Sequence, residues 1–342
     1  MTKPSPRSET PFAFVEAIVL AYRKRGMNPA PALNHAGISG DLRAGPGQRV
    51  GIDAFEDLSA YAMRELDDEA LGWFSRRLPW GSYGMMLRAS LPSRDLGVAV
   101  GRWCRHHNLL TEDVRIELHV ESGTATLRIH EETDLGPLRE FALVSLMRNF
   151  HGITCWLADS RIGVDRVEFP FPAPLHASAY GRMFPGEIGF DAETAAIHFD
   201  AAYLRLPVVR DDDALRQILR RPIPLMARHY GQDRLLSHRI RQLLRSGEVK
   251  DDAGAIATAL GVSLRSLQRH LRDEGTSLLE LKAQGRREAA EDLLGRPDLP
   301  IKRVAHLVGY DNESSFSRAF RGWTGKTPAD FRRAITAERV KS

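Results

Sequence analysis

The fold is decided by residues 255–271, AIATALGVSLRSLQRHL, which return in altered form at residues 303–320, RVAHLVGYDNESSFSRAF. Ala257 and Gly261 of the first stretch match Ala305 and Gly309 of the second at a common offset of 48 residues. A small alanine lets two helices cross closely, and a glycine adopts the positive φ angle that ends a helix at low cost. The pattern therefore predicts a helix, a turn and a second helix, twice.

The second helix of each unit carries its own signals. Ser263 and Asn312 are typical N-cap residues. Apolar side chains at i, i+4 spacing are expected to anchor each helix: Leu267 and Leu271 in the first unit, Phe316 and Phe320 in the second. The positions left facing outward are polar: Arg265, Gln268 and Arg269 in the first unit, and Glu313, Ser314, Ser317 and Arg318 in the second. One such match also occurs in ordinary helical hairpins, but two in tandem favour a pair of DNA-binding helix-turn-helix units over a plain helical bundle.

A connecting helix is predicted between the two units, from Ser277 to Leu294. At 1.5 Å per residue it spans roughly 27 Å. With the width of the units added, the two outward faces come near the spacing of one turn of B-DNA, about 34 Å. Gly285 lies inside this helix at a cost of about 1 kcal/mol, and no sequence-level reason for it is apparent.

Charge is unevenly distributed along the chain. Residues 233–342 contain 21 Lys and Arg against 15 Asp and Glu, whereas the rest of the chain contains 27 against 29. The excess of basic charge therefore lies in the last third of the chain, where we expect a polyanion to bind. A solvated helix surface is the alternative explanation of this charge taken alone.

The region before residue 210 has a mixed α/β pattern. Residues 12–66 favour helices around a Pro/Gly-rich stretch at 28–47, and 93–110 and 138–150 favour further helices. Strict alternation at 114–120 and 124–130 around Ser122-Gly123 predicts a β-hairpin. We also expect a strand at 164–169, a short strand pair at 188–199, and a helix at 214–221 capped by the acidic run at 211–213. The fold class is α+β: a mixed α/β amino-terminal domain followed by an all-α domain.

The length of 342 residues suits two domains. We expect an effector and dimerisation domain at 12–210, a linker at 211–232 with the connection itself at 222–232, and a DNA-binding domain at 233–336 with helix-turn-helix units at about 253–273 and 301–322. No stretch approaches the roughly 18 apolar residues that cross a bilayer, and the first eleven residues are too polar for a signal peptide. With two cysteines, too few for a disulfide framework, the chain is expected in the cytoplasm, away from membranes.

Two clusters in the amino-terminal region invite other interpretations. Trp103-Cys104-Arg105-His106-His107 contains metal-ligating side chains, but no second ligand pair lies at useful spacing, so we expect no metal and no cofactor. An aromatic and methionine cluster could line an apolar cavity or form plain core: Trp73, Phe74, Trp80, Tyr83, Met85 and Met86. The chain also lacks a Gly-rich phosphate loop and a nucleophile elbow, so an enzyme is not expected.

Several segments resemble the AraC/XylS family of transcription regulators. The likeness is strongest between residues 234 and 333, in Ser266 to Leu271, Asp273 to Ser277, and Ser315 to Pro328. Earlier segments resemble the branch whose amino-terminal domain is called arabinose-binding-like: Arg25 to Pro29, Ala36 to Ile38, Phe184 to Phe190 and Phe199 to Leu204. The resemblance thus covers nearly the whole chain.

The resemblance implies a bacterial sequence-specific regulator of promoter DNA. Arg265, Gln268 and Arg269 match base-contacting positions of the first unit, and Glu313, Ser314, Ser317 and Arg318 match those of the second. Glu313 could instead reject wrong sequences or face solvent. Residues 12–205 would bind a small-molecule effector of unknown identity, with a homodimer left open, and an activator would also contact RNA polymerase. The alternatives are an enzyme-like amino-terminal domain fused to a DNA-binding module and a DNA binder without effector.

Overall fold

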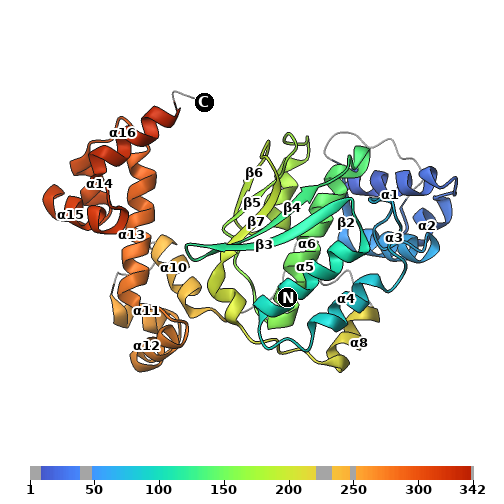
Figure 1. The fold of residues 1–342 in the computed structure, drawn as a ribbon, viewed down its shortest axis with the longest axis horizontal. Coiled ribbons are helices and arrows are strands. Elements are labelled where there is room, and N and C mark those ends of the chain that lie inside the picture. Colours follow the sequence, from blue (N-terminus) through green and yellow to red (C-terminus); the bar gives the residue numbers. More distant parts are fainter. Residues whose placement is uncertain (1–8, 39–47, 221–232, 247–251, 340–342) are drawn as a thin grey trace, which may run out of the picture. The chain divides into compact units, whose positions relative to one another are not determined.

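The computed structural model of the chain describes residues 9–38, 48–220, 233–246 and 252–339 (Figure 1). The chain divides into two compact units, Met1–Arg234 and Leu235–Ser342, each of which is described separately. The expected connection at 222–232 and most of the expected amino-terminal tail lie outside the described residues. Among the described residues, no helix is both long and apolar enough to cross a membrane.

A five-stranded sheet in the order β3-β4-β7-β5-β6 forms the centre of the amino-terminal unit. The predicted hairpin is confirmed, because β3 pairs antiparallel with β4 and the turn residues Ser122 and Gly123 have φ angles of 49° and 85°. β7 continues the sheet antiparallel to β4 and β5, and β6 adds a parallel edge beside β5. The strands are β3 (Val114–Glu121), β4 (Thr124–Glu131), β5 (Arg166–Glu168), β6 (Glu187–Gly189) and β7 (Ala195–Asp200).

The predicted strand pair at 188–199 is wrong in its pairing. β6 and β7 are both strands, but they do not pair with each other. Val167 of β5 lies between them, opposite Ile197 on one side and Ile188 on the other. Alternating side chains identify a strand but not its partner, and here the partner is about 20 to 30 residues away in the sequence.

Helices cover the apolar face of the sheet (Figure 1). Leu127, Ile197 and Val167, from three adjacent strands, are each 0% exposed on this face. α5 (Leu96–Leu110) packs against β3, and α6 (Arg139–Ala158) packs against β7. α5 begins three residues later than predicted, since the Asp95 carboxylate caps it by accepting the N–H of Val98 at 2.9 Å. α6 extends eight residues beyond the predicted 138–150, and it is buried on nearly all sides.

The predicted helices on either side of the Pro/Gly-rich stretch are confirmed as α1 and α3. A two-stranded sheet, missed by the sequence analysis, joins residues that lie about 40 positions apart. The expected helix after residue 211 is confirmed, with Asp211 accepting the N–H of Ala214 at 2.8 Å. The elements are β1 (Glu9–Pro11), α1 (Phe12–Lys24), α2 (Ala30–His35), β2 (Arg49–Gly51), α3 (Ile52–Glu65), α4 (Ser82–Ser90), α7 (Tyr180–Met183) and α8 (Asp212–Arg220).

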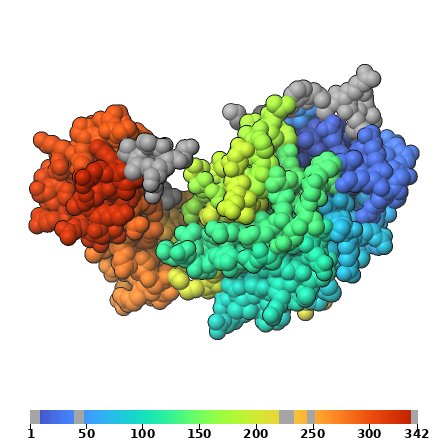
Figure 2. All heavy atoms as spheres, turned by 45° about the horizontal axis from the view of Figure 1, so that its top comes forward, coloured from blue at the N-terminus to red at the C-terminus, as the bar shows by residue number. Residues whose placement is uncertain are grey.

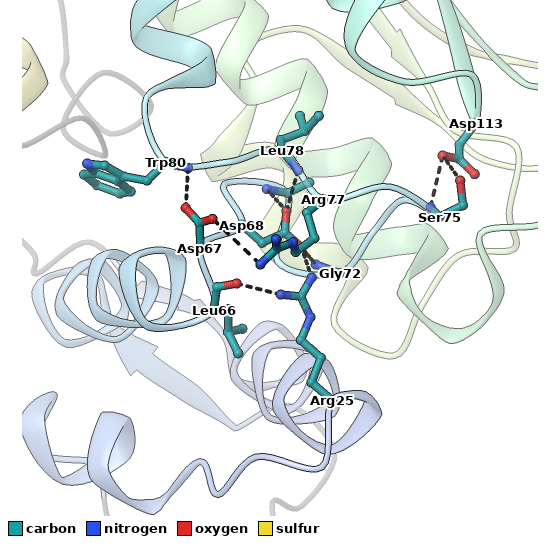
Figure 3. A network of polar contacts seen from close by, with 11 residues as sticks. Arg25, Leu66, Asp67, Asp68, Gly72, Ser75, Arg77, Leu78, Trp80 and Asp113 are labelled. Atoms are coloured by element: carbon teal, nitrogen blue, oxygen red, sulfur yellow. Dashed lines mark hydrogen bonds and ion pairs between the residues drawn. The ribbon is translucent and has the colours of Figure 1, made fainter.

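A buried carboxylate organises the loop between α3 and α4 (Figure 3). Asp68 is 1% exposed and accepts hydrogen bonds from the backbone N–H groups of Ala70, Gly72 and Leu78 at 2.9–3.1 Å. The guanidinium of Arg25, just after α1, completes the set at 2.5 Å. A buried charge is tolerated only when it is paired and fully hydrogen-bonded. Asp68 therefore joins the end of α1 to the loop that leads into α4.

The carboxyl-terminal unit consists of helices, as predicted, with no strand among its described residues. Its two separate apolar cores share one long helix, α13. Leu281 of α13 belongs to the first core, and Ala290 and Leu294 belong to the second. The helices are α10 (Leu236–Ser246), α11 (Ala253–Ala259), α12 (Leu264–Asp273), α13 (Leu278–Leu294), α14 (Ile301–Leu307), α15 (Glu313–Thr324) and α16 (Pro328–Arg339).

Replacing the buried carboxylate tests its structural role. Asp68→Asn should lower the free energy of unfolding by about 3 kcal/mol, because an amide nitrogen would face N–H donors and Arg25 would lose its ion pair. Urea unfolding of the full chain, followed by tryptophan fluorescence, measures the change. Asp67→Asn is the matched control, since Asp67 is about half exposed and the amide oxygen can still accept the N–H of Trp80, now 3.0 Å away. Its expected change is within about 0.5 kcal/mol. Equal losses in the two variants would contradict the assignment.

Candidate DNA interface

The first helix-turn-helix unit is built from α11 and α12. Asp252 caps α11 by accepting the N–H of Ala255 at 2.9 Å. Gly261 follows with a φ angle of 67°, in the left-handed region that a glycine adopts without strain. Ser263 then caps α12 by accepting the N–H of Ser266 at 3.1 Å. The predicted roles are both confirmed: Gly261 ends the first helix, and Ser263 caps the second.

The second unit, α14 and α15, has the same construction. Gly309 has a φ angle of 86°. Asn312 caps α15 by accepting the N–H of Ser315 at 2.8 Å. α15 ends at Gly325, again with a left-handed φ angle, of 72°. The predicted sequence repeat is therefore also a structural repeat. The turn of the second unit contains one extra residue.

The small and apolar residues of both units are buried as predicted. Ala257 is 3% exposed and Ala305 is 0% exposed, which allows the close helix crossing that their size implies. The anchors of the second helices are at most 1% exposed: Leu267, Leu271, Phe316 and Phe320. Because these anchors fix one side of α12 and of α15, the other side of each helix faces outward.

The predicted outward residues lie on the surface of this unit, whose atoms are drawn orange to red in Figure 2. Six of the seven are exposed: Arg265, Gln268, Arg269, Glu313, Ser314 and Arg318. Ser317 is only half-buried, beside the anchor Phe316. Within the described part of the chain, the guanidinium groups of Arg265 and Arg318 have no ion-pair partner, which leaves their donors available to a ligand.

Two further basic residues on the same faces were missed by the sequence analysis. Arg272 and Arg321 are exposed, and each lies one turn beyond the predicted set. Arg272 follows Arg265 at i+7, and Arg321 follows Ser314 at i+7, so each shares the face of its helix with the predicted residues. Continuing the i, i+3, i+4 spacing by one turn would have found both.

α13 begins with a complete capping box. The Ser277 hydroxyl accepts the N–H of Glu280 at 3.2 Å, and the Glu280 carboxylate accepts the N–H of Ser277 at 2.8 Å. This arrangement satisfies two of the backbone donors at the helix start. Gly285 lies inside the helix, and a Cβ atom added there would have no neighbour within 4 Å. The structure offers no steric reason for a glycine at this position.

The Cys104–His107 segment has no reactive or metal-binding character in the described structure. Burial raises the pKa of the Cys104 thiol to about 12, which keeps it protonated. His107 is 0% exposed, whereas His106, the residue before it on α5, is half-buried. Among the described residues no group of three or more His, Cys, Asp or Glu side chains is arranged to hold a metal ion.

The predicted aromatic and methionine cluster divides into buried and exposed members. Trp73, Phe74 and Met86 are buried in the amino-terminal unit. Trp80 and Met85 are 38% and 58% exposed, so they belong to the surface. Tyr83 is intermediate. The six residues thus do not form one cavity wall.

Two helix-turn-helix units with exposed polar second helices, joined by a shared helix, define a DNA-binding regulator. Residues 26–208 match the family model described as "Arabinose-binding domain of AraC transcription regulator, N-term", and residues 256–334 match the model "Helix-turn-helix domain". The first match alone covers more than half of the chain. The chain belongs to the AraC family of transcription regulators.

Similar proteins extend over the full length of the chain. The "Ornithine utilization regulator" of Pseudomonas aeruginosa is 31% identical, with 95% of this chain and 96% of the relative covered. "HTH-type transcriptional regulator VirS" of Mycobacterium tuberculosis is 26% identical over 91% of this chain and 92% of its own. The solved structure of the transcriptional regulator CdpR from Pseudomonas aeruginosa is 21% identical, covers 95% of this chain and 98% of its own, and has a TM-score of 0.32.

Two glycine substitutions should act in opposite directions. Gly285→Ala should stabilise α13 by about 1 kcal/mol, since it adds helix propensity without a clash. Gly309→Ala should destabilise the second unit by about 1–2 kcal/mol, because alanine is strained at a positive φ angle. Hydrogen exchange of the full chain, read on peptides from α13 to α15, measures both changes. Slower exchange in Gly309→Ala, or faster exchange in Gly285→Ala, would contradict this account.

Buried His107 should make stability depend on pH. Burial lowers its pKa from 6.5 to about 4, so the unfolded chain binds this proton more tightly than the folded chain. The stabilising contribution is therefore complete above pH ~6.5 and is lost as the pH falls toward 4, by on the order of 3 kcal/mol. Urea unfolding at several pH values, compared between the natural chain and His107→Phe, measures it. The difference in unfolding free energy between the two should change across this window, and a constant difference would contradict the assignment.

Proposed function

We propose that α12 and α15 read base edges in two successive major-groove segments of promoter DNA. The reading residues are Arg265, Gln268 and Arg269 on α12, and Glu313, Ser314, Ser317 and Arg318 on α15. One observation carries this proposal: each helix is anchored in a core on one side while its polar residues face outward. Since the anchors fix the helix axis, the outward side chains extend from a rigid support, as base reading requires.

The chemistry of the outward residues suits base recognition. Arginine donates two hydrogen bonds to O6 and N7 of guanine, glutamine bonds N6 and N7 of adenine, and glutamate accepts from N4 of cytosine. Arg272 and Arg321, one turn further along each helix, are suited to phosphate oxygens, which fix register without reading sequence. The first unit offers three arginines on this face and the second offers two together with Glu313. The two units would therefore prefer different base sequences, and the site read by one chain would be asymmetric.

The shared helix sets the spacing of the two readers. α13 has 17 residues and is therefore about 26 Å long. With the width of the two units added, this length agrees with one turn of B-DNA, about 34 Å. The backbone hydrogen bonds of α13 fix its length. The two DNA segments that α12 and α15 read must therefore lie at one fixed spacing.

The amino-terminal unit then controls DNA binding in response to a small molecule. We further propose that the protein is an activator that contacts RNA polymerase, that it forms a homodimer through residues 12–210, and that it acts in the cytoplasm, where bacterial DNA lies. The connection at 211–232 would carry the response to the DNA-binding domain at 233–336. The two relatives described above carry names that do not point to a common effector. The effector of this chain must therefore be inferred from its own residues.

Single arginine replacements test the proposed readers. Arg269→Ala and Arg318→Ala should each weaken binding to the preferred DNA site by about 1–3 kcal/mol and relax base preference at one position. Fluorescence anisotropy with the preferred site and with single-base variants of it measures both effects, and a salt series shows the phosphate contribution. Arg23→Ala removes an exposed arginine of α1, far from the connection in sequence, and is the matched control. Unchanged affinity and base preference in both reader variants would refute the assignment.

A further inference from the structure

Buried aromatic side chains of the amino-terminal unit contain ring nitrogens that make no hydrogen bond with any described residue. Both ring nitrogens of His107 and the Nε1 atoms of Trp73 and Trp103 are of this kind. The three side chains are 0%, 4% and 2% exposed, respectively. Each buried polar group left unpaired costs about 1–3 kcal/mol, so native proteins contain few of them. Several in one neighbourhood indicate a place where another molecule supplies the missing partners.

His107 lies at the centre of a group of aromatic rings, called here the His107 cluster: Trp73, Phe74, Tyr83, Trp103 and His107. The ring centroid of His107 is 5.5 Å from that of Trp103, 5.9 Å from that of Phe74 and 6.2 Å from that of Tyr83. Trp73 adjoins Phe74 at 6.1 Å. The cluster therefore combines flat apolar surfaces with a few polar ring edges, which is the composition of a small-molecule site.

The polar atoms of the cluster define the chemistry of a ligand. Indole nitrogens only donate hydrogen bonds, and a neutral imidazole donates one and accepts one. His107 is neutral at pH 7, because burial lowers its pKa to about 4. The ring nitrogens of the cluster thus offer three donors and one acceptor, and the hydroxyl of Tyr83, which also has no hydrogen-bond partner among the described residues, can donate or accept. Donors predominate, so a ligand must present acceptor oxygens or nitrogens.

The acidic side chain beside the cluster disfavours an anion, and a cation would bring no acceptor for the unpaired ring N–H groups. The buried carboxyl group of Glu69 accepts the backbone N–H of Tyr83 at 2.7 Å, so an acidic side chain lies beside the cluster. Burying an anion beside it would be unfavourable. A cation would face N–H donors on Trp73 and Trp103. An uncharged molecule with a carbonyl group meets neither difficulty.

We propose that the His107 cluster is the effector site and that it takes an uncharged, flat or cyclic small molecule whose carbonyl oxygen accepts hydrogen bonds from the ring N–H groups. This assignment rests on the proposed control of DNA binding by a small molecule. α4 separates the cluster from solvent, since Tyr83 on this helix contacts His107 while Met85, two residues on, is 58% exposed. A ligand would enter beside α4.

A polar depression at one end of β4 offers a contrast. It has a volume of about 410 Å³ and is lined by Glu131, Asp134, Arg139 and Glu193, among others. Its groups already satisfy one another: Arg139 donates two hydrogen bonds of 2.7 Å to Glu131, and Asp134 accepts the N–H of Gly136 at 2.8 Å. His130 also lines it, and its Nε2 atom makes no hydrogen bond but lies 3.5 Å from a carboxylate oxygen of Glu117. The depression is thus lined mainly by charged groups that pair with one another, whereas the His107 cluster combines aromatic surfaces with uncharged donors.

Three probes of similar size test the proposal on the full chain. Acetophenone has one uncharged carbonyl, ethylbenzene has none, and benzoate is an anion. Acetophenone should move the indole N–H resonances of Trp73 and Trp103 downfield in ¹H–¹⁵N spectra, with a Kd on the order of 1 mM for so small a molecule. Ethylbenzene and benzoate should bind at least about tenfold more weakly, which corresponds to the loss of one good hydrogen bond.

Matched variants identify the site. His107→Phe and Trp103→Phe should each weaken acetophenone binding about tenfold, whereas Trp156→Phe, a buried tryptophan of α6 outside the cluster, should leave it unchanged. Equal binding of acetophenone and ethylbenzene, tighter binding of benzoate, or no shift of either indole resonance would overturn the proposal. These measurements contain no DNA. Failure of the arginine variants to affect DNA binding would therefore count against the proposed readers and leave the ligand site standing.

Discussion

One helix belongs to both cores of the carboxyl-terminal unit, and the DNA-binding geometry depends on it. Leu281 of α13 packs in the first core and Ala290 in the second, nine residues later. At 1.5 Å and 100° per residue, these positions are about 14 Å apart along the axis and half a turn apart around it. The two helix-turn-helix units therefore pack on opposite sides of one rod. Neither unit can change its distance from the other without breaking backbone hydrogen bonds.

The features that sequence reasoning predicted correctly are local ones. The roles of Gly261 and Ser263 follow from turn and cap chemistry within a few residues, and the same chemistry recurs 48 or 49 residues later. The pairing of β5 between β6 and β7 was missed, because the alternating pattern of a strand does not specify its neighbour. The end of α6 was missed because a helix buried on all sides has no polar face to mark its period. For the DNA interface, sequence reasoning predicted the outward faces of both helices correctly. It missed Arg272 and Arg321, which lie one turn further along the same faces.

Three acidic residues of the amino-terminal unit, Asp68, Glu69 and Asp113, hold loops together through hydrogen bonds. Asp68 accepts hydrogen bonds from three backbone N–H groups and from Arg25. Glu69 accepts hydrogen bonds from the N–H groups of Gly81 and Tyr83. Asp113 accepts hydroxyl hydrogen bonds from Thr111, Ser75 and Thr133; although burial opposes its charge, these bonds lower its pKa. These residues look like surface charges in the sequence. Their burial is visible only once α1, the loop after α3 and the start of β3 are brought together.

The absence of a side chain at Gly84 of α4 has a mechanical consequence. A Cβ atom there would lie 3.1 Å from a methyl carbon of Leu219, so α8 rests directly on the backbone of α4. The side chain of Leu219 is the part of α8 that meets α4 at this point. α8 is also the last described helix of its unit before residues 221–232. A larger side chain at position 84 would push against Leu219, so the glycine sets how closely α4 and α8 can approach.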